Sequence, residues 1–283
     1  MVLESLINPF VAEQNPKRMF FYGALYSSVA IFLSLWVFEG QASLVMVFLT
    51  TMACIPLVYG TMRLEEKKDE EISEERSLLK EHGKAIEFFI FLFLGMTLAM
   101  AFWYVVLPTN VTEQLFSVQS ETISKINSPT TGRDAALSSF SRIFLNNLQV
   151  LVFSLLFAFL YGVGTIFILA WNASVIAAAI GNFVRQGLAE SAALIGFSKA
   201  GAYFKVVGLG LFRYAIHGIP EILAYFVVGL AGGIISVAML RQGLDFEKFK
   251  RVVIDSADLI IISIVILFVA AVLEVYVTPK IFF

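Results

Sequence analysis

Repeated apolar stretches of about twenty residues are the feature that most restricts how this chain can fold. Clear examples are Met19–Phe38, Ala85–Leu107 and Leu259–Val277. A stretch of this length can cross a bilayer as a helix, and in lipid only helices and closed barrels satisfy the backbone hydrogen bonds. Hydrophobic residues make up 59% of the 283 residues, and charged residues only 15%. The sequence therefore predicts an all-α, polytopic transmembrane helical bundle.

The predicted bundle has about six full spans and one or two short, re-entrant or broken helices. The other three full spans are Ala42–Tyr59, Asn147–Trp171 and Ile222–Leu240. The apolar segments 173–183 and 206–216 are too short for a full crossing. We expect them to be half-helices or re-entrant hairpins beside a cytoplasmic stretch, 186–205. The alternative is a thin or tilted region of the bundle.

Charge divides the chain into three parts. Residues 1–107 form an N-terminal three-helix membrane portion, 108–140 a loop, and 141–283 a second membrane domain with broken helices. The connector 61–84 carries six Lys or Arg and eight Asp or Glu residues, whereas the loop has only Lys125 and Arg133 as basic residues. The positive-inside rule then places the N-terminus and the connector in the cytoplasm, and the loop and the C-terminus outside.

The connector has two interpretations. Its helix-forming residues and its charge run favour a solvated helical hairpin that joins two spans. The other interpretation is a docking surface for a cytosolic partner.

A polar break, His217-Gly-Ile-Pro-Glu221, interrupts an otherwise apolar tract. Ionisable residues at membrane depth are costly and mark a candidate functional site. His217 and Glu221 share a helix face, and Pro220 suits the first turn of a helix that restarts. The break could be half of a metal site, part of a proton or ion pathway, or a satisfied polar network that fixes helix geometry.

The sequence gives little indication of a metal site or a catalytic site. The second histidine, His82, lies in the connector, and Cys54 is the only cysteine. No nucleophile–base pattern, phosphate loop or dinucleotide fingerprint occurs. We therefore expect no metal, no cofactor and no enzyme activity. Glu274, late in the last span, is expected to reach the lipid headgroups.

Asparagines border the fourth predicted span. Asn146 and Asn147 open it, and Asn172 closes it. These amides either cap freed backbone groups or line a polar cavity together with Glu221. We expect His217 and Glu221 to lie inside the bundle, within reach of Asn147 or Asn172.

Small residues mark two faces on which helices can approach closely. One face carries Gly162 and Gly164, and the other carries Gly229 and Gly233. Such faces serve packing within one chain or formation of a homodimer.

The order of these elements resembles the stage II sporulation protein M family of bacterial and archaeal membrane proteins. The resemblance covers roughly residues 140–277. It rests on the following elements: the asparagine pair, Leu160-Tyr-Gly-Val-Gly-Thr165, Trp171-Asn172, Gly181, and His217-Gly-Ile-Pro-Glu221 followed by Gly229-Leu-Ala-Gly-Gly233. It implies a non-catalytic membrane anchor, since the sporulation member works with two extracellular peptidoglycan-degrading partners.

Two functions are compatible with the sequence. The first is a non-enzymatic protein of the cell membrane that organises or anchors a complex, with lipid, a second copy, or extracellular or cytoplasmic proteins as partners. The alternative is a transporter or channel for an ion or small solute, with its polar site at the broken helices. A net charge of −2 and the lack of a basic stripe exclude nucleic acid as a partner.

Overall fold

The computed structural model describes residues 15–71, 75–126, 135–161, 164–190, 197–240 and 246–282. Within these ranges the regular elements are all helical, without a strand. Seven of the described helices are long and apolar enough to cross a membrane. The prediction of an all-α, polytopic bundle is therefore confirmed.

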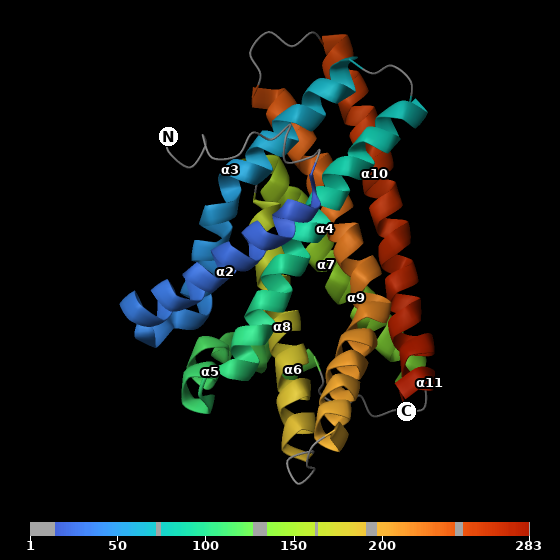
Figure 1. Ribbon diagram of the computed structural model, residues 1–283. Coiled ribbons are helices and arrows are strands. Elements are labelled where there is room, and N and C mark those ends of the chain that lie inside the picture. The colour runs from blue at the N-terminus through green and yellow to red at the C-terminus, as the bar shows by residue number, and fades with distance from the viewer. Residues whose placement is uncertain are drawn as a thin grey trace.

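The long helices run alternately up and down the bundle (Figure 1). They are α2 (Lys17–Val37), α3 (Ala42–Glu71), α4 (Glu75–Val106), α7 (Ala135–Tyr161), α8 (Thr165–Glu190), α9 (Phe197–Leu240) and α10 (Phe246–Val272). The short elements are η1 (Glu39–Gln41), α5 (Thr109–Leu115), α6 (Ser117–Ile126), a π-helix η2 (Leu273–Val277) and α11 (Thr278–Phe282). We call the end of the bundle with α5, α6 and α11 the α11 end, and the opposite end, where α3 finishes and α4 starts, the α3–α4 end (Figure 1).

Helix α9 is the centre of the bundle. It contacts α3, α4, α7, α8 and α10. Its candidate span, Ala215–Leu240, is 83% buried, against 17% for the span in α7 and 22% for the span in α10. A helix that is apolar on all sides is stable in such a position, because every face meets another helix.

The predicted break in α9 is wrong. Residues 197–240 form one helix of 44 residues, with Pro220 inside it. The segment 206–216 is therefore the middle of a long helix. A proline removes one backbone N–H donor, and groups on neighbouring helices can satisfy the carbonyl that loses its partner. A full interruption of the helix would leave many more backbone N–H and C=O groups without hydrogen bonds in lipid.

The predicted fourth span is also wrong, because α7 ends at Tyr161 and α8 begins at Thr165. The turn lies in a run that is itself apolar, so hydropathy alone does not mark it. The segment 173–183 thus lies inside α8, which is the additional full span. The described residues of the 186–205 stretch lie at the α11 end, on the same side as α5 and α6 (Figure 1).

The helices α5 and α6 pack onto the bundle. Gln119 of α6 is fully buried. Its Oε1 accepts a hydrogen bond from Ser43 Oγ of α3 at 2.6 Å, and its Nε2 donates to Ser174 Oγ of α8 at 3.1 Å. The described part of the 108–140 loop therefore belongs to the folded body.

Candidate functional site

A polar stripe runs along one face of α9. His217, Glu221 and Tyr225 follow at intervals of four residues; the first two are half-buried and Tyr225 is fully buried. The Tyr225 hydroxyl donates to Glu221 Oε1 at 2.9 Å. His217 Nδ1 lies 3.4 Å from Oγ1 of Thr278, at the start of α11. The stripe therefore faces the C-terminal end of the chain.

Glu274 completes this cluster from the opposite helix. The contact between His217 and Thr278 fixes the register of α9 against the antiparallel chain of η2 and α11. Glu221 follows His217 by four residues, and Glu274 precedes Thr278 by four residues. The two glutamates therefore lie at the same level along the bundle axis. Their carboxylates interact electrostatically. Glu274 is half-buried. Its predicted contact with the lipid headgroups stays a prediction.

The π-helix η2 shapes this side of the cluster. The backbone N–H of Thr278 donates to the carbonyl of Leu273, five residues earlier. The Thr278 hydroxyl donates to the same carbonyl at 3.1 Å. A single π turn inside an α-helix is rare, and such turns are frequent at functional sites. Here the wide turn carries Glu274.

The asparagines make their own hydrogen bonds. Asn146 Nδ2 donates to Asn147 Oδ1 at 3.3 Å, and Asn172 Nδ2 donates to the carbonyl of Ile168 in its own helix at 2.8 Å. Asn147 is buried and Asn146 is exposed. Asn172 lies inside α8 rather than at the end of a span.

The register of α7 against α9 relates Asn147 to Glu221. A Cβ added at Gly232 would lie 2.8 Å from the Cβ of Ala158, so these two residues are in contact. Both helices run in the same direction (Figure 1). Asn147 lies eleven residues before Ala158, and Glu221 lies eleven residues before Gly232. Because eleven residues are about three turns in each helix, Asn147 and Glu221 lie at the same level along the bundle axis. A direct contact between their side chains stays a prediction.

The predicted glycine faces lie at helix contacts within the chain. A Cβ at Gly233 would lie 2.5 Å from Met62 Sδ, and one at Gly229 would meet Thr165. A Cβ at Gly164 would lie 2.8 Å from that of Phe157. Gly162 lies outside the described residues. Since the Gly229–Gly233 face is occupied inside the bundle, a homodimer would have to use another surface.

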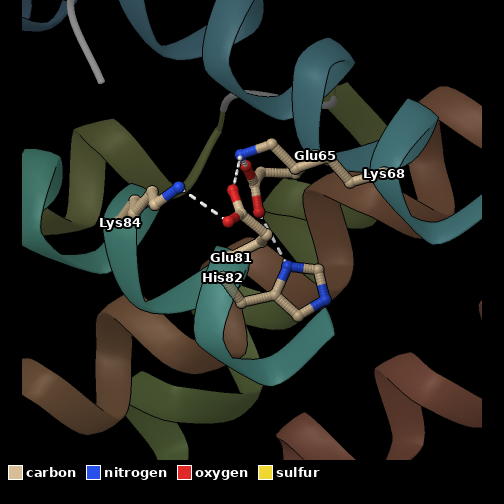
Figure 2. A network of polar contacts seen from close by, with 5 residues as sticks. All are labelled: Glu65, Lys68, Glu81, His82 and Lys84. Carbon is tan, nitrogen blue, oxygen red and sulfur yellow. Dashed lines mark hydrogen bonds and ion pairs between the residues drawn. The ribbon is translucent and has the colours of Figure 1, made fainter. Parts of the chain in front are cut away.

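A second polar cluster joins α3 to α4 at their common end (Figure 2). Glu65 and His82 are both buried, with His82 Nδ1 2.7 Å from Glu65 Oε2. Lys68 Nζ donates to Glu65 Oε1 at 2.6 Å and lies 3.4 Å from Glu81 Oε2. Lys84 Nζ donates to Glu81 Oε1 at 2.6 Å. The described parts of the connector are helical, as predicted, and they place Glu65, Lys68 and Glu81 in a partly buried network rather than on a solvated face.

Arg185 ties α8 to the corner between α4 and α5. It donates to the carbonyl of Leu107 and to Thr112 Oγ1, the latter at 3.0 Å. Its guanidinium carbon lies 5.3 Å from the centre of the Tyr104 ring. The last carbonyls of a helix have no partner within it, and Arg185 supplies one for α4. This contact fixes the α11 end of the bundle.

The side chains of the α9–η2 cluster are groups that can accept or donate a proton. Among the residues that the structure describes, no group of three or more His, Cys, Asp and Glu could hold a metal ion. The cluster of α9 and η2 combines two carboxylates with an imidazole and two hydroxyls, all of which can accept or donate a proton.

Comparison with known families gives one match. A family model described as stage II sporulation protein M matches residues 88–279, about two thirds of the chain. The chain belongs to the stage II sporulation protein M family. No curated protein and no solved structure matches it.

The matched region of the stage II sporulation protein M family is larger than the resemblance in the sequence. It begins within α4, at residue 88, and ends within α11. The whole cluster of α9 and η2 therefore lies inside the family region. The Glu65–His82 network, together with α2 and α3, lies before it.

Three parts of these clusters were not foreseen. Tyr225 and Thr278 are inconspicuous in an apolar sequence, although Tyr225 follows Glu221 at the helical spacing of four. The pairing of Glu65 with His82 crosses from one helix to the next, which sequence spacing cannot reveal. Only the high density of charged residues in the connector 61–84 indicated that polar contacts form there.

Proposed function

We propose that this member of the family is a non-enzymatic protein that anchors or organises a complex in the cell membrane. The observation that supports this most strongly is the packing around α9. Gly229 and Gly233 lie so close to Thr165 and Met62 that even an added methyl group would clash. Close contacts of this kind between α9, α8 and α3 favour a rigid, packed body over a channel along this face of α9. A rigid body of this kind suits a protein that holds partners in place.

Both ends of the bundle offer folded surfaces for partners. At the α3–α4 end, the charged network fixes the helical hairpin of α3 and α4. At the α11 end, α5 and α6 are held by Arg185 and Gln119. The distribution of Lys and Arg favours a cytoplasmic location for the α3–α4 end and the N-terminus, and an outside location for the C-terminus. A homodimer would form through a lipid-facing surface.

A transporter or channel is the second candidate function. It is favoured by the three ionisable groups His217, Glu221 and Glu274 within candidate spans. Such groups at membrane depth often belong to ion or proton pathways.

A crosslinking experiment tests the anchoring proposal in cells. A photo-crosslinking amino acid is placed at Lys84 or at Glu113, which are exposed at opposite ends, and at Ile261 as a control on an exposed apolar face. We expect at least one of the polar positions to capture a discrete protein that Ile261 does not capture. Absence of any specific product from both ends would contradict the proposal.

A flux experiment separates the two functions. The purified protein is reconstituted into vesicles that report proton, sodium and potassium movement. Anchoring predicts no flux above that of protein-free vesicles. Flux that is lost in Glu221→Gln, with the helical content and melting temperature retained, would establish transport and overturn the anchoring proposal.

A further inference from the structure

The first part of α9 extends past neighbouring helices at the α11 end (Figure 1). A Cβ added at Gly232 would touch the Cβ of Ala158, and this contact sets the level of α9 against the parallel helix α7. Counted back from the contact, α7 begins at Ala135 after 23 residues, and α9 begins at Phe197 after 35. The first twelve residues of α9 therefore extend about 18 Å beyond the start of α7. We call residues 197–213 the α9 tip.

The α9 tip exposes apolar side chains outside the candidate span of α9, which begins at Ala215. Val207, Leu209 and Phe212 are 39%, 41% and 55% exposed. Large apolar side chains that gather on a surface outside the membrane mark places where another molecule binds. The α9 tip is therefore a candidate interaction surface.

The same part of α9 is positively charged. Lys205 is exposed, and it precedes Leu209 and Phe212 by four and seven positions, so these three side chains share one side of the helix. The stretch 191–220 also contains Lys199 and Arg213, but no Asp or Glu. Complementary charge steers a surface toward the right partner and excludes partners of the same charge. The α9 tip therefore fits a partner that is both acidic and apolar.

The bilayer and a second copy fit the α9 tip less well. The candidate span of α7 begins at Ser138, close to the start of that helix, so the start of α7 lies near the edge of the apolar layer. The headgroup layer is about 5–8 Å deep, whereas the tip reaches about 18 Å beyond the start of α7. A symmetric contact between two copies would bring two Lys205 side chains together, with no Asp or Glu in the stretch 191–220 to pair with them.

We infer that the α9 tip holds a protein partner on the α11 side, through a partner segment that carries apolar side chains and an Asp or Glu that pairs with Lys205. Gly201 and Gly208 lie on the same face as Lys205, and a Cβ added at either would meet no atom within 4 Å. A partner backbone can approach closely there, since no side chain stands in its way. The inference rests on the proposed anchoring function, for which it names a surface and the chemistry of the partner.

Zero-length crosslinking with a water-soluble carbodiimide tests the inference, because it joins an amine to a carboxylate only when the two are in contact. Membranes that contain the full chain are treated with the reagent, and crosslinked peptides are sequenced by mass spectrometry. We expect Lys205 to be joined to another protein, at an Asp or Glu that lies among apolar residues. Lys280, which is exposed on α11 at the same end, is the matched control and should give no such product.

A second variant blocks the surface without disturbing the fold. Gly208→Gln adds a long side chain where the structure has room for it, so the melting temperature should be kept and the crosslink from Lys205 lost. Gly83→Gln makes the same change at an open position of α4 and should keep the crosslink. An undiminished crosslink in Gly208→Gln would overturn the inference.

The product formed at Lys205 also separates the alternatives. An adduct with the mass of a lipid would assign the α9 tip to the membrane surface, and a crosslinked dimer of this chain would assign it to a second copy; both results overturn the inference, as does the absence of any product. Photo-crosslinking from Lys84 or Glu113 that captures a protein, without a product at Lys205, would leave the anchoring proposal standing. Absence of products at all three positions would contradict both.

Discussion

The Glu65–His82 pair shows how single residues decide whether a charge can be buried. Both side chains are almost without solvent exposure. Removing a charge from water costs several kcal/mol, which only a close partner with good geometry repays. Lys68 provides Glu65 with a second partner. Loss of a buried member of this network therefore costs more stability than loss of the same charge on a surface.

Replacement of His82 tests this network. We expect His82→Ala to lower the free energy of unfolding by about 3 kcal/mol, because Glu65 then keeps a buried charge with one partner fewer. Lys84→Ala is the matched control: its side chain is 51% exposed, so its loss should cost less than about 1 kcal/mol. Denaturant unfolding in detergent micelles measures both. Equal effects of the two variants would contradict a special role of the buried pair.

Helices α2 and α4 show what decides the packing of whole elements. A Cβ added at Gly23 would run into the backbone carbonyl of Leu92, and one at Gly95 into that of Phe20. The two backbones thus touch directly at a pair of glycines, as small residues permit in membrane helices. Gly23 and Gly95 are far apart in the chain and form no short motif, so the sequence does not mark them as a contact.

Substitution of these glycines should separate α2 from α4. The clash at Gly95 involves backbone atoms, which no rotamer change can move, so Gly95→Ala should destabilise the protein by about 1–3 kcal/mol. Gly83→Ala, in the same helix, has no atom within 4 Å of the added Cβ. It should be neutral or stabilising by up to about 1 kcal/mol, because alanine favours helix over glycine. Thermal unfolding followed by circular dichroism compares the two, and a stabilising Gly95→Ala would refute the close approach.

The seven candidate spans of the described residues bear on the sidedness of the whole molecule. Seven crossings would put the start of α2 and the end of α10 on opposite sides of the membrane. The continuous helix α9 also brings the described residues of the 186–205 stretch to the α11 end, where charge alone did not place them (Figure 1).

Labelling of single cysteines tests this arrangement. Cys54, which is buried, is replaced by alanine, and one cysteine is introduced at Lys84, Glu247, Glu113 or Lys205, all of them exposed. A membrane-impermeant thiol reagent should label Glu113→Cys and Lys205→Cys from one side, and Lys84→Cys and Glu247→Cys from the other. If Lys205→Cys were labelled together with Lys84→Cys, α9 would not cross the membrane as one helix.

The sequence by itself determined the class of fold and the places where chemistry gathers. Long apolar stretches in lipid form helices, because a helix satisfies its own backbone hydrogen bonds. The spans in α2, α3, α4 and α10 therefore follow from composition and length alone. The motif from His217 to Glu221 and the glycines after it also carried the family resemblance that the match over residues 88–279 confirms.

Only the tertiary structure decided where helices end and which polar groups meet. Hydropathy is nearly uniform across the turn between α7 and α8, so it cannot mark that turn. Conversely, the polar motif around Pro220 lies inside one continuous helix. The contacts of His217 with Thr278 and of Glu65 with His82 join different helices, and their pairing depends on helix register. Such pairings strongly affect stability in a protein interior, because a buried charge that loses its partner has no water to hydrogen-bond with instead.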